Sequence, residues 1–236
     1  MPAMPPHPPI PPRGRGRPPQ LPRLGLEEAA ATLARGGIVI FPTETLYAIG
    51  CRADKAPACV RIREIKGRPD GSPLPLLAGD REQAARAVRL EAAPERLLEV
   101  FWPGPLSLLL PALPGIAPEA RNGDGLAALR VTSHPLAGRL AALAGFALTA
   151  SSANFSGGAP AARAEGLDAA LLAALARSGD DVGLLAASAP EDEPQGGAPS
   201  TLAQPCVGPE GIFLRLFREG AVSAKALAAA GFLVLP

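Results

Sequence analysis

Two cations flank a single glycine in the stretch Lys66-Gly67-Arg68. Lysine offers phosphate oxygens a point charge, and arginine offers them a planar fork that forms two parallel hydrogen bonds. The pair follows a segment of helical character, residues 56–66, so it could equally complement the dipole at the carboxyl end of a helix. The spacing favours an anion-binding clamp, but the alternative, that both cations only stabilise the end of the helix, stays open.

Polar side chains follow two apolar runs that are typical of buried strands. Residues 38–41 lead into Pro42-Thr43-Glu44-Thr45-Leu46-Tyr47, and residues 146–150 overlap Thr149-Ala150-Ser151-Ser152-Ala153-Asn154. Open α/β sheets bind ligands beyond the carboxyl ends of their strands, where hydroxyl and amide groups can donate to a phosphate. Both segments are therefore candidate ligand contacts, although each could also be an ordinary turn.

Single arginines, Arg130 and Arg218, end two further predicted strands. One arginine in such a position often forms only a surface ion pair, so each is no more than a candidate for anion binding. Neither of the phosphate-loop motifs GxGxxG and GxxxxGK[ST] occurs. His134, directly before Pro135, is expected to cap a helix. Catalysis by a histidine base is therefore disfavoured, and the chemistry must rest on positioning and charge.

The elements that must position these residues alternate between helix and strand. Helices are predicted at residues 26–35, 56–66, 81–89, 136–144, 167–176 and 224–230. Strands are predicted at residues 38–41, 74–78, 106–110, 126–131, 146–150, 182–186 and 212–216. In the second helix we expect Val60, Ile62 and Ile65 to face inward. Alternation without a fixed repeat predicts one open α/β sheet.

Composition separates a tail from a globular body. The chain has 236 residues, 47% of them apolar and 19% charged, which suits a single substantial core. Residues 1–23 hold ten prolines, four arginines and no acid, which predicts a disordered tail ahead of one domain at 24–236. The net charge is +1, so the tail arginines leave the domain at −3, which disfavours binding a nucleic-acid backbone along a broad face. Residues 188–199, rich in acids, glycine and proline, are predicted to form a mobile loop.

Cysteine and histidine usage argues against a bound metal. Three cysteines and two histidines show no zinc-binding spacing, so we expect no structural metal. The sparse, odd cysteine count favours a reducing compartment. No apolar run reaches the roughly 18–20 residues of a membrane span, and the start lacks the layout of a secretory signal. We therefore expect a cytoplasmic protein without membrane contact.

Seven stretches, taken in order, resemble the YrdC-type threonylcarbamoyl-AMP synthase family. They are GGIVIFPTETLYAIGC, IREIKGRPDGSPLPLL, FWPGPLSLLLP, LRVTSHPLAGRL, LTASSANFSG, PST and FREGAVS. The resemblance covers roughly residues 24–230 and is closest to the short, single-domain type. It implies an α/β fold with a YrdC-like twisted open mixed sheet, flanking helices and a basic concave cavity.

The resemblance also implies which residues form the site. Lys66 and Arg68 match the family's lysine–arginine motif and are the implied catalytic residues, binding the ATP phosphates. The further implied ATP-binding residues are Ser72, Ser151, Ser152, Asn154 and Arg218. The implied threonine-binding residues are Thr43, Arg130, Thr149 and Ser200.

Three positions depart from the family pattern. Ala48 replaces a glycine, which reduces backbone freedom there. Ser72 stands where many members have asparagine, and Leu77 where many have histidine. The last change puts one contact to threonine in doubt.

By the same resemblance, the expected activity is that of an L-threonylcarbamoyladenylate synthase. Such an enzyme joins L-threonine, bicarbonate and ATP into threonylcarbamoyl-AMP and pyrophosphate for tRNA modification. Mg²⁺ is expected with ATP, and tRNA and a threonylcarbamoyl-transferring complex are expected as indirect partners. Three alternatives stay open: a carbamoyl-adenylate-forming protein, a non-catalytic RNA-binding YrdC-like module, and a family member whose substrate has shifted.

Overall fold

The computed structural model describes residues 21–236 except 69, 70, 180 and 210. The described helices are α1 (Leu26–Ala34), α2 (Ala56–Lys66), α3 (Arg81–Ala85), α4 (Glu95–Phe101), α5 (Pro135–Ala144), α6 (Ala169–Arg177) and α7 (Ala224–Ala229). The described strands are β1 (Ile38–Pro42), β2 (Tyr47–Gly50), β3 (Leu76–Ala78), β4 (Leu106–Pro111), β5 (Leu126–Val131), β6 (Leu148–Thr149), β7 (Ser151–Ser152), β8 (Val182–Leu184), β9 (Thr201–Gly208), β10 (Gly211–Arg218) and β11 (Leu233–Leu235). The longest of these helices has 11 residues, so none of them can cross a bilayer, which takes about 20.

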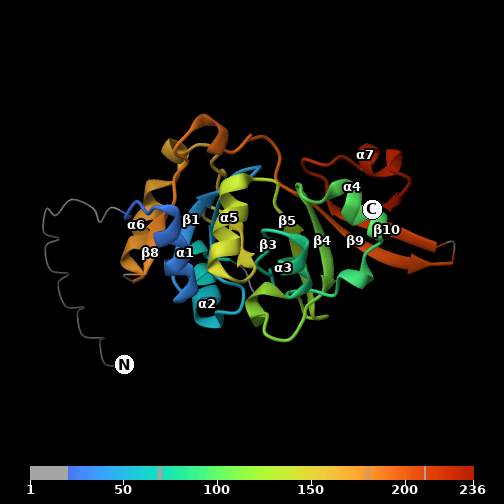
Figure 1. Cartoon of the computed structure of the whole chain (residues 1–236), viewed down its shortest axis with the longest axis horizontal. Helices are drawn as coiled ribbons and strands as arrows, with labels where there is room; N and C mark the ends of the chain where they lie inside the picture. The colour runs from blue at the N-terminus through green and yellow to red at the C-terminus, as the bar shows by residue number, and fades with distance from the viewer. Residues whose placement is uncertain (1–20, 69–70, 180, 210) are drawn as a thin grey trace, which may run out of the picture.

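The strands form two mixed sheets, which lie side by side along the long axis of the molecule (Figure 1). The smaller sheet has the order β7-β2-β1-β8, and the larger has the order β11-β10-β9-β4-β5-β3-β6. In the smaller sheet β1 runs antiparallel to β2 and parallel to β8. The expected mixed α/β fold with flanking helices is confirmed, but the one sheet predicted from the alternation is in fact two.

The chain crosses from one sheet to the other at the end of a predicted strand. In residues 146–150 and their continuation, β6 pairs with β3 of the larger sheet, whereas β7 pairs with β2 of the smaller sheet. The break between them falls at Ala150. Periodicity alone does not register such a crossing, because both halves are extended and mostly buried. The crossing brings Ser151 and Ser152 to the junction of the sheets.

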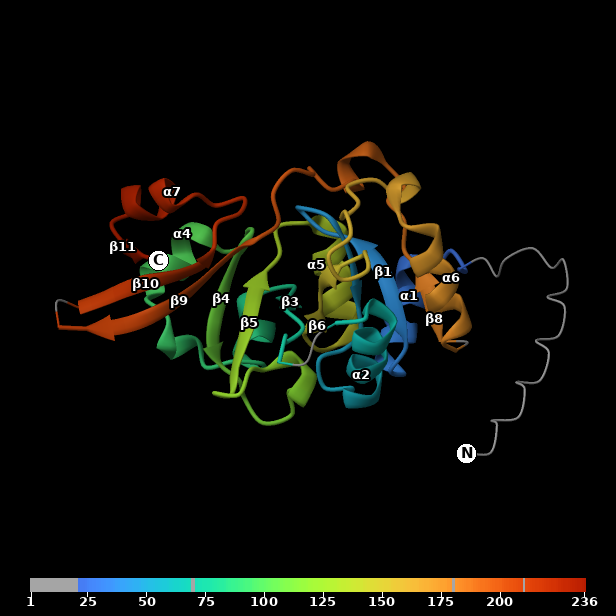
Figure 2. The same ribbon diagram turned by 180° about the vertical axis from the view of Figure 1, so that it is seen from behind.

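Strand β1 is buried on both faces, because helices cover both sides of the smaller sheet. Ile38 and Ile40 belong to the core that α2 and α6 help to form, whereas Val39 and Phe41 belong to the core formed with α1 and α5. Helix α5 lies toward the viewer in Figure 1, and α2 lies toward the viewer in the reverse view of Figure 2. A strand covered in this way must be apolar at every position. The uninterrupted run in the sequence has this origin.

Helix α2 has the predicted bounds, but its buried face differs from the prediction. Ile62 is buried and Ile65 is partly buried, as expected, whereas Val60 is 40% exposed. The buried stripe instead includes Cys59, Ile62 and Lys66. Their spacing of three and four residues places them on one side of a helix. The burial of a lysine at the end of this stripe bears directly on the site.

Other boundaries also depart from the predictions. Helix α3 ends at Ala85 instead of residue 89, and α4, β2, β7, β9 and β11 were not predicted. Strand β9 contains Pro205 and ends at Gly208, both of which argue against a strand in a sequence-based prediction. Pairing with β10 extends over both residues, whereas β4 pairs only with residues 201–203, so Pro205 lies where β9 has a neighbour on one side only.

The amino-terminal tail is described only in part, whereas the acidic loop at residues 188–199 is described throughout. Residues 1–20 of the predicted tail lie outside the described residues. Arg23 forms a parallel bridge with Leu184, and the amide of Leu184 donates to the carbonyl of Pro22, so the packed chain includes residues before 24. Within 188–199 the structure contains a short 3-10 turn at Pro190–Asp192.

Candidate active site

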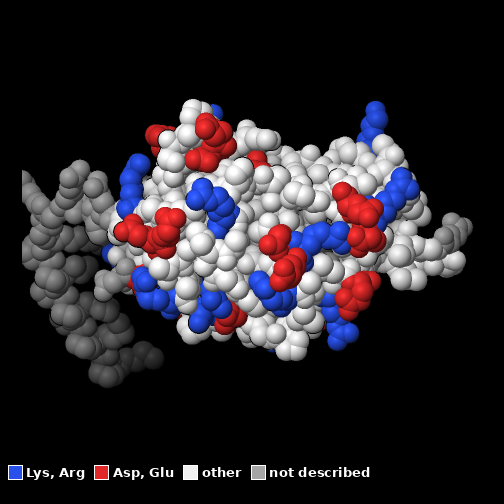
Figure 3. Space-filling model, viewed as in Figure 1, with Lys and Arg blue, Asp and Glu red and all other residues white. Residues whose placement is uncertain are grey.

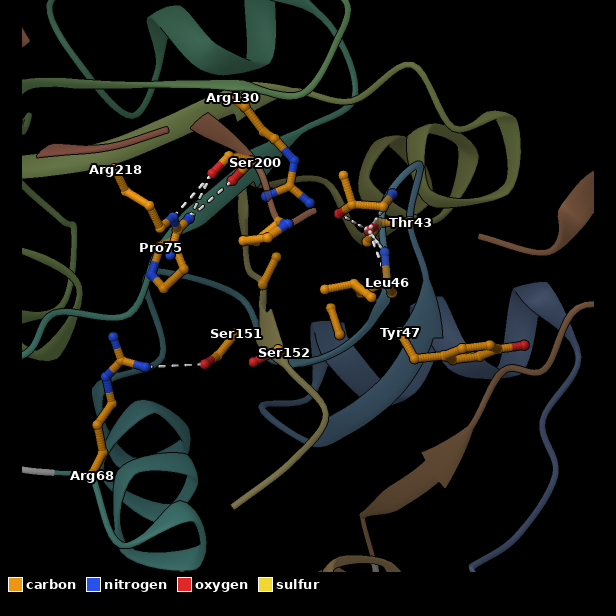
Figure 4. Close-up of a pocket in the computed structure, with 14 residues that line it drawn as sticks. Thr43, Leu46, Tyr47, Arg68, Pro75, Arg130, Ser151, Ser152, Ser200 and Arg218 are labelled. Atoms are coloured by element: carbon orange, nitrogen blue, oxygen red, sulfur yellow. Dashed lines mark hydrogen bonds between the residues drawn. The ribbon is translucent and has the colours of Figure 1, made fainter. Parts of the chain in front are cut away.

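A cavity opens at the junction of the two sheets. The cavity has a volume of about 110 Å³. Figure 4 shows Arg68, Arg130 and Arg218 turned toward it from three different elements. The expected basic concave cavity is thus present. Its lining residues are Thr43, Thr45, Leu46, Tyr47, Ala48, Arg68, Pro75, Arg130, Ala150, Ser151, Ser152, Pro199, Ser200 and Arg218.

Arg68 is held at the cavity wall by three hydrogen bonds. Gly67 ends α2 in the left-handed conformation (φ 57°), which glycine adopts without a steric penalty. The Nε and Nη2 groups of Arg68 donate to the carbonyl oxygens of Ser72 and Pro73, each at 3.0 Å, and Nη1 donates to Ser151 Oγ at 3.2 Å. These partners are neutral, so the positive charge of Arg68 is not compensated by them.

Lys66 occupies a different position from Arg68. Its side chain is buried, with the residue only 3% exposed, and its Nζ donates to the carbonyl oxygens of Ser152, at 2.5 Å, and Asn154. Burial, followed by the nearby charge of Arg68, lowers the pKa of Lys66 from 10.5 to about 8. Lys66 does not line the cavity. The predicted clamp is therefore divided: Arg68 faces the cavity, and Lys66 holds the 152–154 segment behind it.

The segment after β6 divides in the same way. Ser151 and Ser152 line the cavity. Asn154 is buried, and its Nδ2 group donates to the carbonyl oxygens of Phe155 and Gly158, at 2.6 and 2.8 Å. Asn154 therefore closes the turn that follows the two serines of β7.

Thr149 is also turned away from the cavity. It is fully buried, and its Oγ1 accepts a hydrogen bond from the amide of Cys51 at 3.0 Å. A Cβ on Gly50 would lie 1.9 Å from the carbonyl oxygen of Thr149, so only glycine allows the strands to approach here. Thr149 thus joins the two sheets at the floor of the junction.

Arg218 and Ser200 meet on the opposite wall. The pairing of β9 and β10 shifts register between Leu216 and Arg218, and such irregularities redirect a side chain. The Nε and Nη2 groups of Arg218 donate to the carbonyl oxygen of Ser200 at 3.1 and 2.8 Å. The hydroxyl of Ser200 lies 3.1 Å from that of Ser107. Arg218, like Arg68, is therefore held by neutral oxygen atoms.

Arg130 forms an ion pair, but a buried one instead of the surface pair considered from the sequence. Its Nε donates to Glu44 Oε1 at 2.7 Å, and Thr132 Oγ1 donates to Glu44 Oε2 at 2.5 Å. Burial alone would raise the pKa of Glu44, but the charge of Arg130 and these hydrogen bonds hold it below its ordinary value. Within the described residues, Nη1 and Nη2 of Arg130 have no hydrogen-bond partner, and they face the cavity (Figure 4).

Thr43 lines the cavity from the turn after β1. Its Oγ1 donates to the carbonyl of Leu46 at 2.7 Å and accepts weakly from the amides of Thr45 and Leu46, each at 3.4 Å. These hydrogen bonds hold the turn together. Tyr47 also lines the cavity, but its hydroxyl points away from it and accepts a hydrogen bond from the amide of Ala187 (Figure 4).

Like charges face one another across the cavity. Burial, and then the charges of Arg63 and Arg218, lower the pKa of Arg68. Burial, and then the charge of Arg130, lower the pKa of Arg218. An arginine stays protonated despite such shifts. A bound anion would relieve the mutual repulsion, so the arrangement suits a polyanionic ligand.

The three departures from the family pattern have different consequences. Ala48 lines the cavity in regular β2, and no described residue other than glycine has a positive φ, so glycine is not required there. Ser72 accepts from Arg68 through its carbonyl and does not line the cavity. Leu77 is fully buried in the core beneath α1 and α5, so its side chain does not reach the cavity.

The acidic partner of the site is not evident from the sequence. Glu44 lies inside the polar stretch after β1, but its partners Arg130 and Thr132 are more than 80 residues away, so no local pattern indicates the pairing. His134 behaves as predicted: its Nδ1 accepts from the amide of Ala137 at 3.3 Å and caps α5.

The donor set does not suit a resident metal. Across residues 21–236, apart from the four undescribed positions, no three His, Cys, Asp or Glu side chains form a cluster that could hold an ion. Glu44, beside the cavity, is already engaged by Arg130 and Thr132.

Figure 3 shows acidic and basic side chains interspersed over the face of the molecule that it presents, and this face has no continuous basic strip of the kind that binds a nucleic-acid backbone.

Comparison with known proteins places this chain in a family. A family model for Sua5, YciO and YrdC proteins, described as "Telomere recombination", matches residues 31–205. The chain is 38% identical to the threonylcarbamoyl-AMP synthase of Halorhodospira halophila over 137 residues, which is 58% of this chain and 72% of that protein. It is 36% identical to the threonylcarbamoyl-AMP synthase of Stenotrophomonas maltophilia over 152 residues, 63% of this chain and 82% of that protein.

A solved structure agrees with the family match. The crystal structure of P. abyssi Sua5 complexed with L-threonine superimposes with a TM-score of 0.72 and 27% identity. The match covers 89% of this chain but only 59% of the P. abyssi chain, so the present chain spans less than two thirds of that protein. The family model and the relatives together show that this chain belongs to the Sua5/YciO/YrdC family.

Proposed function

We propose that this chain is a threonylcarbamoyl-AMP synthase. It joins L-threonine, bicarbonate and ATP into threonylcarbamoyl-AMP, pyrophosphate and water, and the product serves tRNA modification. The H. halophila and S. maltophilia relatives carry this name, and P. abyssi Sua5 was crystallised with L-threonine. The observation that carries the proposal is the junction cavity, where Arg68, Arg130 and Arg218 converge.

The reaction requires two negatively charged reactants to meet. The amine of threonine attacks bicarbonate, or the CO₂ formed from it, and gives a carbamate. An oxygen of the carbamate then attacks the α-phosphorus of ATP, and the bond to the leaving pyrophosphate breaks. Fixed positive groups in a partly enclosed cavity favour this encounter, because they need no reorganisation and are screened less than in water.

The amino-acid end lies at Arg130. Its Nη1 and Nη2 form a fork that matches the threonine carboxylate. Thr43 and Ser200 line the same cavity and offer hydroxyls to the remaining polar groups of threonine. Thr149 contributes through the backbone of Cys51 that it holds at the sheet junction.

The nucleotide end lies at Arg68 and Arg218, whose charges are met only by neutral protein oxygens among the contacts above. These arginines bind the phosphates, with Ser151 and Ser152 beside them. Lys66, whose ammonium is bound by the carbonyls of Ser152 and Asn154, adds its charge from behind and fixes the serine segment. Ser72 contributes by fixing Arg68.

The accessory components follow from the same chemistry. Because Mg²⁺ in nucleotide sites is bound largely by the substrate phosphates, it enters with the triphosphate as part of the substrate. Threonylcarbamoyl-AMP is an activated acyl donor, so a partner complex must transfer its threonylcarbamoyl group to tRNA.

The decisive measurement is pyrophosphate release from ATP and bicarbonate, with and without L-threonine. The proposal requires release that depends on both threonine and bicarbonate, together with a product of the mass of threonylcarbamoyl-AMP. Release driven by carbamoyl phosphate without threonine would instead identify a carbamoyl-adenylate former. Salt-sensitive RNA binding with no turnover would identify a binding module and defeat the proposal.

A further inference from the structure

A buried carboxylate stands beside the three arginines of the cavity. Glu44 is 6% exposed, and both of its oxygens are used. Oε1 accepts from Arg130 Nε at 2.7 Å, and Oε2 accepts from Thr132 Oγ1 at 2.5 Å. The mechanism above gives this carboxylate no direct contact with either substrate.

The contact with Glu44 sets Arg130 apart from the other two arginines. Arg68 and Arg218 donate to the neutral oxygens of Ser72, Pro73, Ser151 and Ser200. Arg130 instead donates to an ionised partner, so the pair as a whole has no net charge. Because Nε of Arg130 donates to Glu44, the guanidinium group is oriented with both Nη groups turned to the cavity.

Glu44 is itself held from several directions. Its own carbonyl accepts from the amide of Gln195 at 3.3 Å, and the carbonyl of the next residue, Thr45, accepts from the amide of Gly196 at 2.9 Å. Thr132 Oγ1, its hydroxyl partner, accepts from the amide of His134 at 3.1 Å. The turn after β1, the end of β5 and the 188–199 loop therefore converge on Glu44. A carboxylate anchored in this way can fix a neighbouring side chain.

We propose that Glu44 is a positioning residue that also sorts the two anionic substrates. It aims the Nη fork of Arg130 at the amino-acid carboxylate, and by neutralising Arg130 it keeps polyphosphate away from that end of the cavity. A carboxylate with one negative charge still forms two well-aligned hydrogen bonds with the Nη groups of Arg130, even though Arg130 and Glu44 together carry no net charge. A triphosphate gains more from the uncompensated charges of Arg68 and Arg218. This inference rests on the proposed function.

The test uses Glu44→Gln, which keeps the shape of the side chain and removes its charge. KM for threonine, KM for ATP and kcat are measured by pyrophosphate release, and inorganic tripolyphosphate serves as a probe of where polyanions bind. We expect the threonine KM to rise about 10- to 100-fold, the loss of one charge-assisted contact, with the ATP KM within about twofold. We also expect tripolyphosphate to become competitive with threonine in the variant but not in the wild type.

Thr132→Val is the matched comparison, because it removes one hydrogen bond to Glu44 and leaves the charge. It should raise the threonine KM by a smaller factor and leave tripolyphosphate non-competitive with threonine. A purely structural role for Glu44 would change both KM values together or lower kcat alone, and either result overturns the inference. Unchanged threonine KM in Glu44→Gln overturns it as well.

Two further measurements keep the outcomes distinct. Wild-type enzyme without threonine-dependent pyrophosphate release defeats the proposed function, whereas active wild type with an unaffected Glu44→Gln variant defeats only this inference. Threonine and tripolyphosphate binding by calorimetry judges the sorting of anions independently of turnover. If Glu44→Gln fails to fold, the threonine affinity of Thr132→Val tests the positioning role in its place. An unchanged affinity in that variant contradicts the role.

Discussion

Replacing Arg68 with alanine should slow adenylate formation about 10- to 100-fold. The guanidinium lies at the cavity wall and is held by Ser72, Pro73 and Ser151. Its loss removes one hydrogen bond to a charged phosphate, worth about 1.5–3 kcal/mol. At about 1.4 kcal/mol for each tenfold change in rate, this range corresponds to a loss of about one to two decades. The effect should appear in kcat/KM for ATP and leave the threonine KM within about twofold.

Two companion variants separate charge from geometry and from general damage. Arg68→Lys keeps a positive charge but cannot bridge the 72–73 carbonyls and Ser151 together, so its rate should fall between those of wild type and Arg68→Ala. Arg35→Ala is the control, because Arg35 is exposed and its ion pair with Asp181 lies at the surface. Such pairs contribute about 0–1 kcal/mol to stability, so this variant should keep the wild-type rate.

The assay is steady-state pyrophosphate release at varied ATP, with threonine and bicarbonate saturating. Circular dichroism at the assay temperature verifies that each variant is folded. A wild-type kcat/KM for ATP in folded Arg68→Ala would refute the assignment of Arg68 to the phosphates. A rise confined to the threonine KM would show that Arg68 contacts threonine and not the phosphates of ATP.

Three further predictions concern residues around the cavity. The pKa of Lys66 is lowered from 10.5 to about 8 in the folded protein, so between these pH values the unfolded chain holds one more proton than the folded chain. Wild type should therefore become more stable relative to Lys66→Met as the pH rises from 8 to 10, and the difference in unfolding free energy should stay constant below pH 8. Denaturant titrations of both proteins measure this difference. A difference that stays level across this range would contradict the burial of the ammonium. Thr149→Val leaves the buried amide of Cys51 without its acceptor, which should cost about 1–3 kcal/mol in chemical denaturation while the threonine KM rises less than in Glu44→Gln; a large KM effect without loss of stability would show direct contact. Gly50→Ala places a Cβ 1.9 Å from the Thr149 carbonyl, so its melting temperature should fall by the equivalent of about 1–3 kcal/mol or more, and an unchanged melting curve would be inconsistent with that approach.

Local sequence determined most elements and several of the groups that do chemistry. The apolar run of β1, the bounds of α2 and β5, and the histidine cap of α5 follow from short-range patterns that a few neighbouring residues decide. Residue chemistry in the same way indicated an anion clamp at Lys66 and Arg68 and disfavoured histidine catalysis, whereas the family resemblance implied a basic cavity. Arg68, Ser151 and Ser200 line that cavity, as the resemblance implied.

Only the tertiary structure decided which of these groups face the cavity and which support it. Lys66 and Arg68 are two residues apart, yet the carbonyls of a segment more than 80 residues away bind the first, while the second lies at the cavity wall. Glu44 and Arg130, separated by 86 positions, form a buried ion pair beside the cavity. Periodicity reports only whether a position is buried, whereas desolvation and long-range pairing decide what a buried charge must contact. That choice is made when the two sheets pack together, which is why the sequence alone did not reveal it.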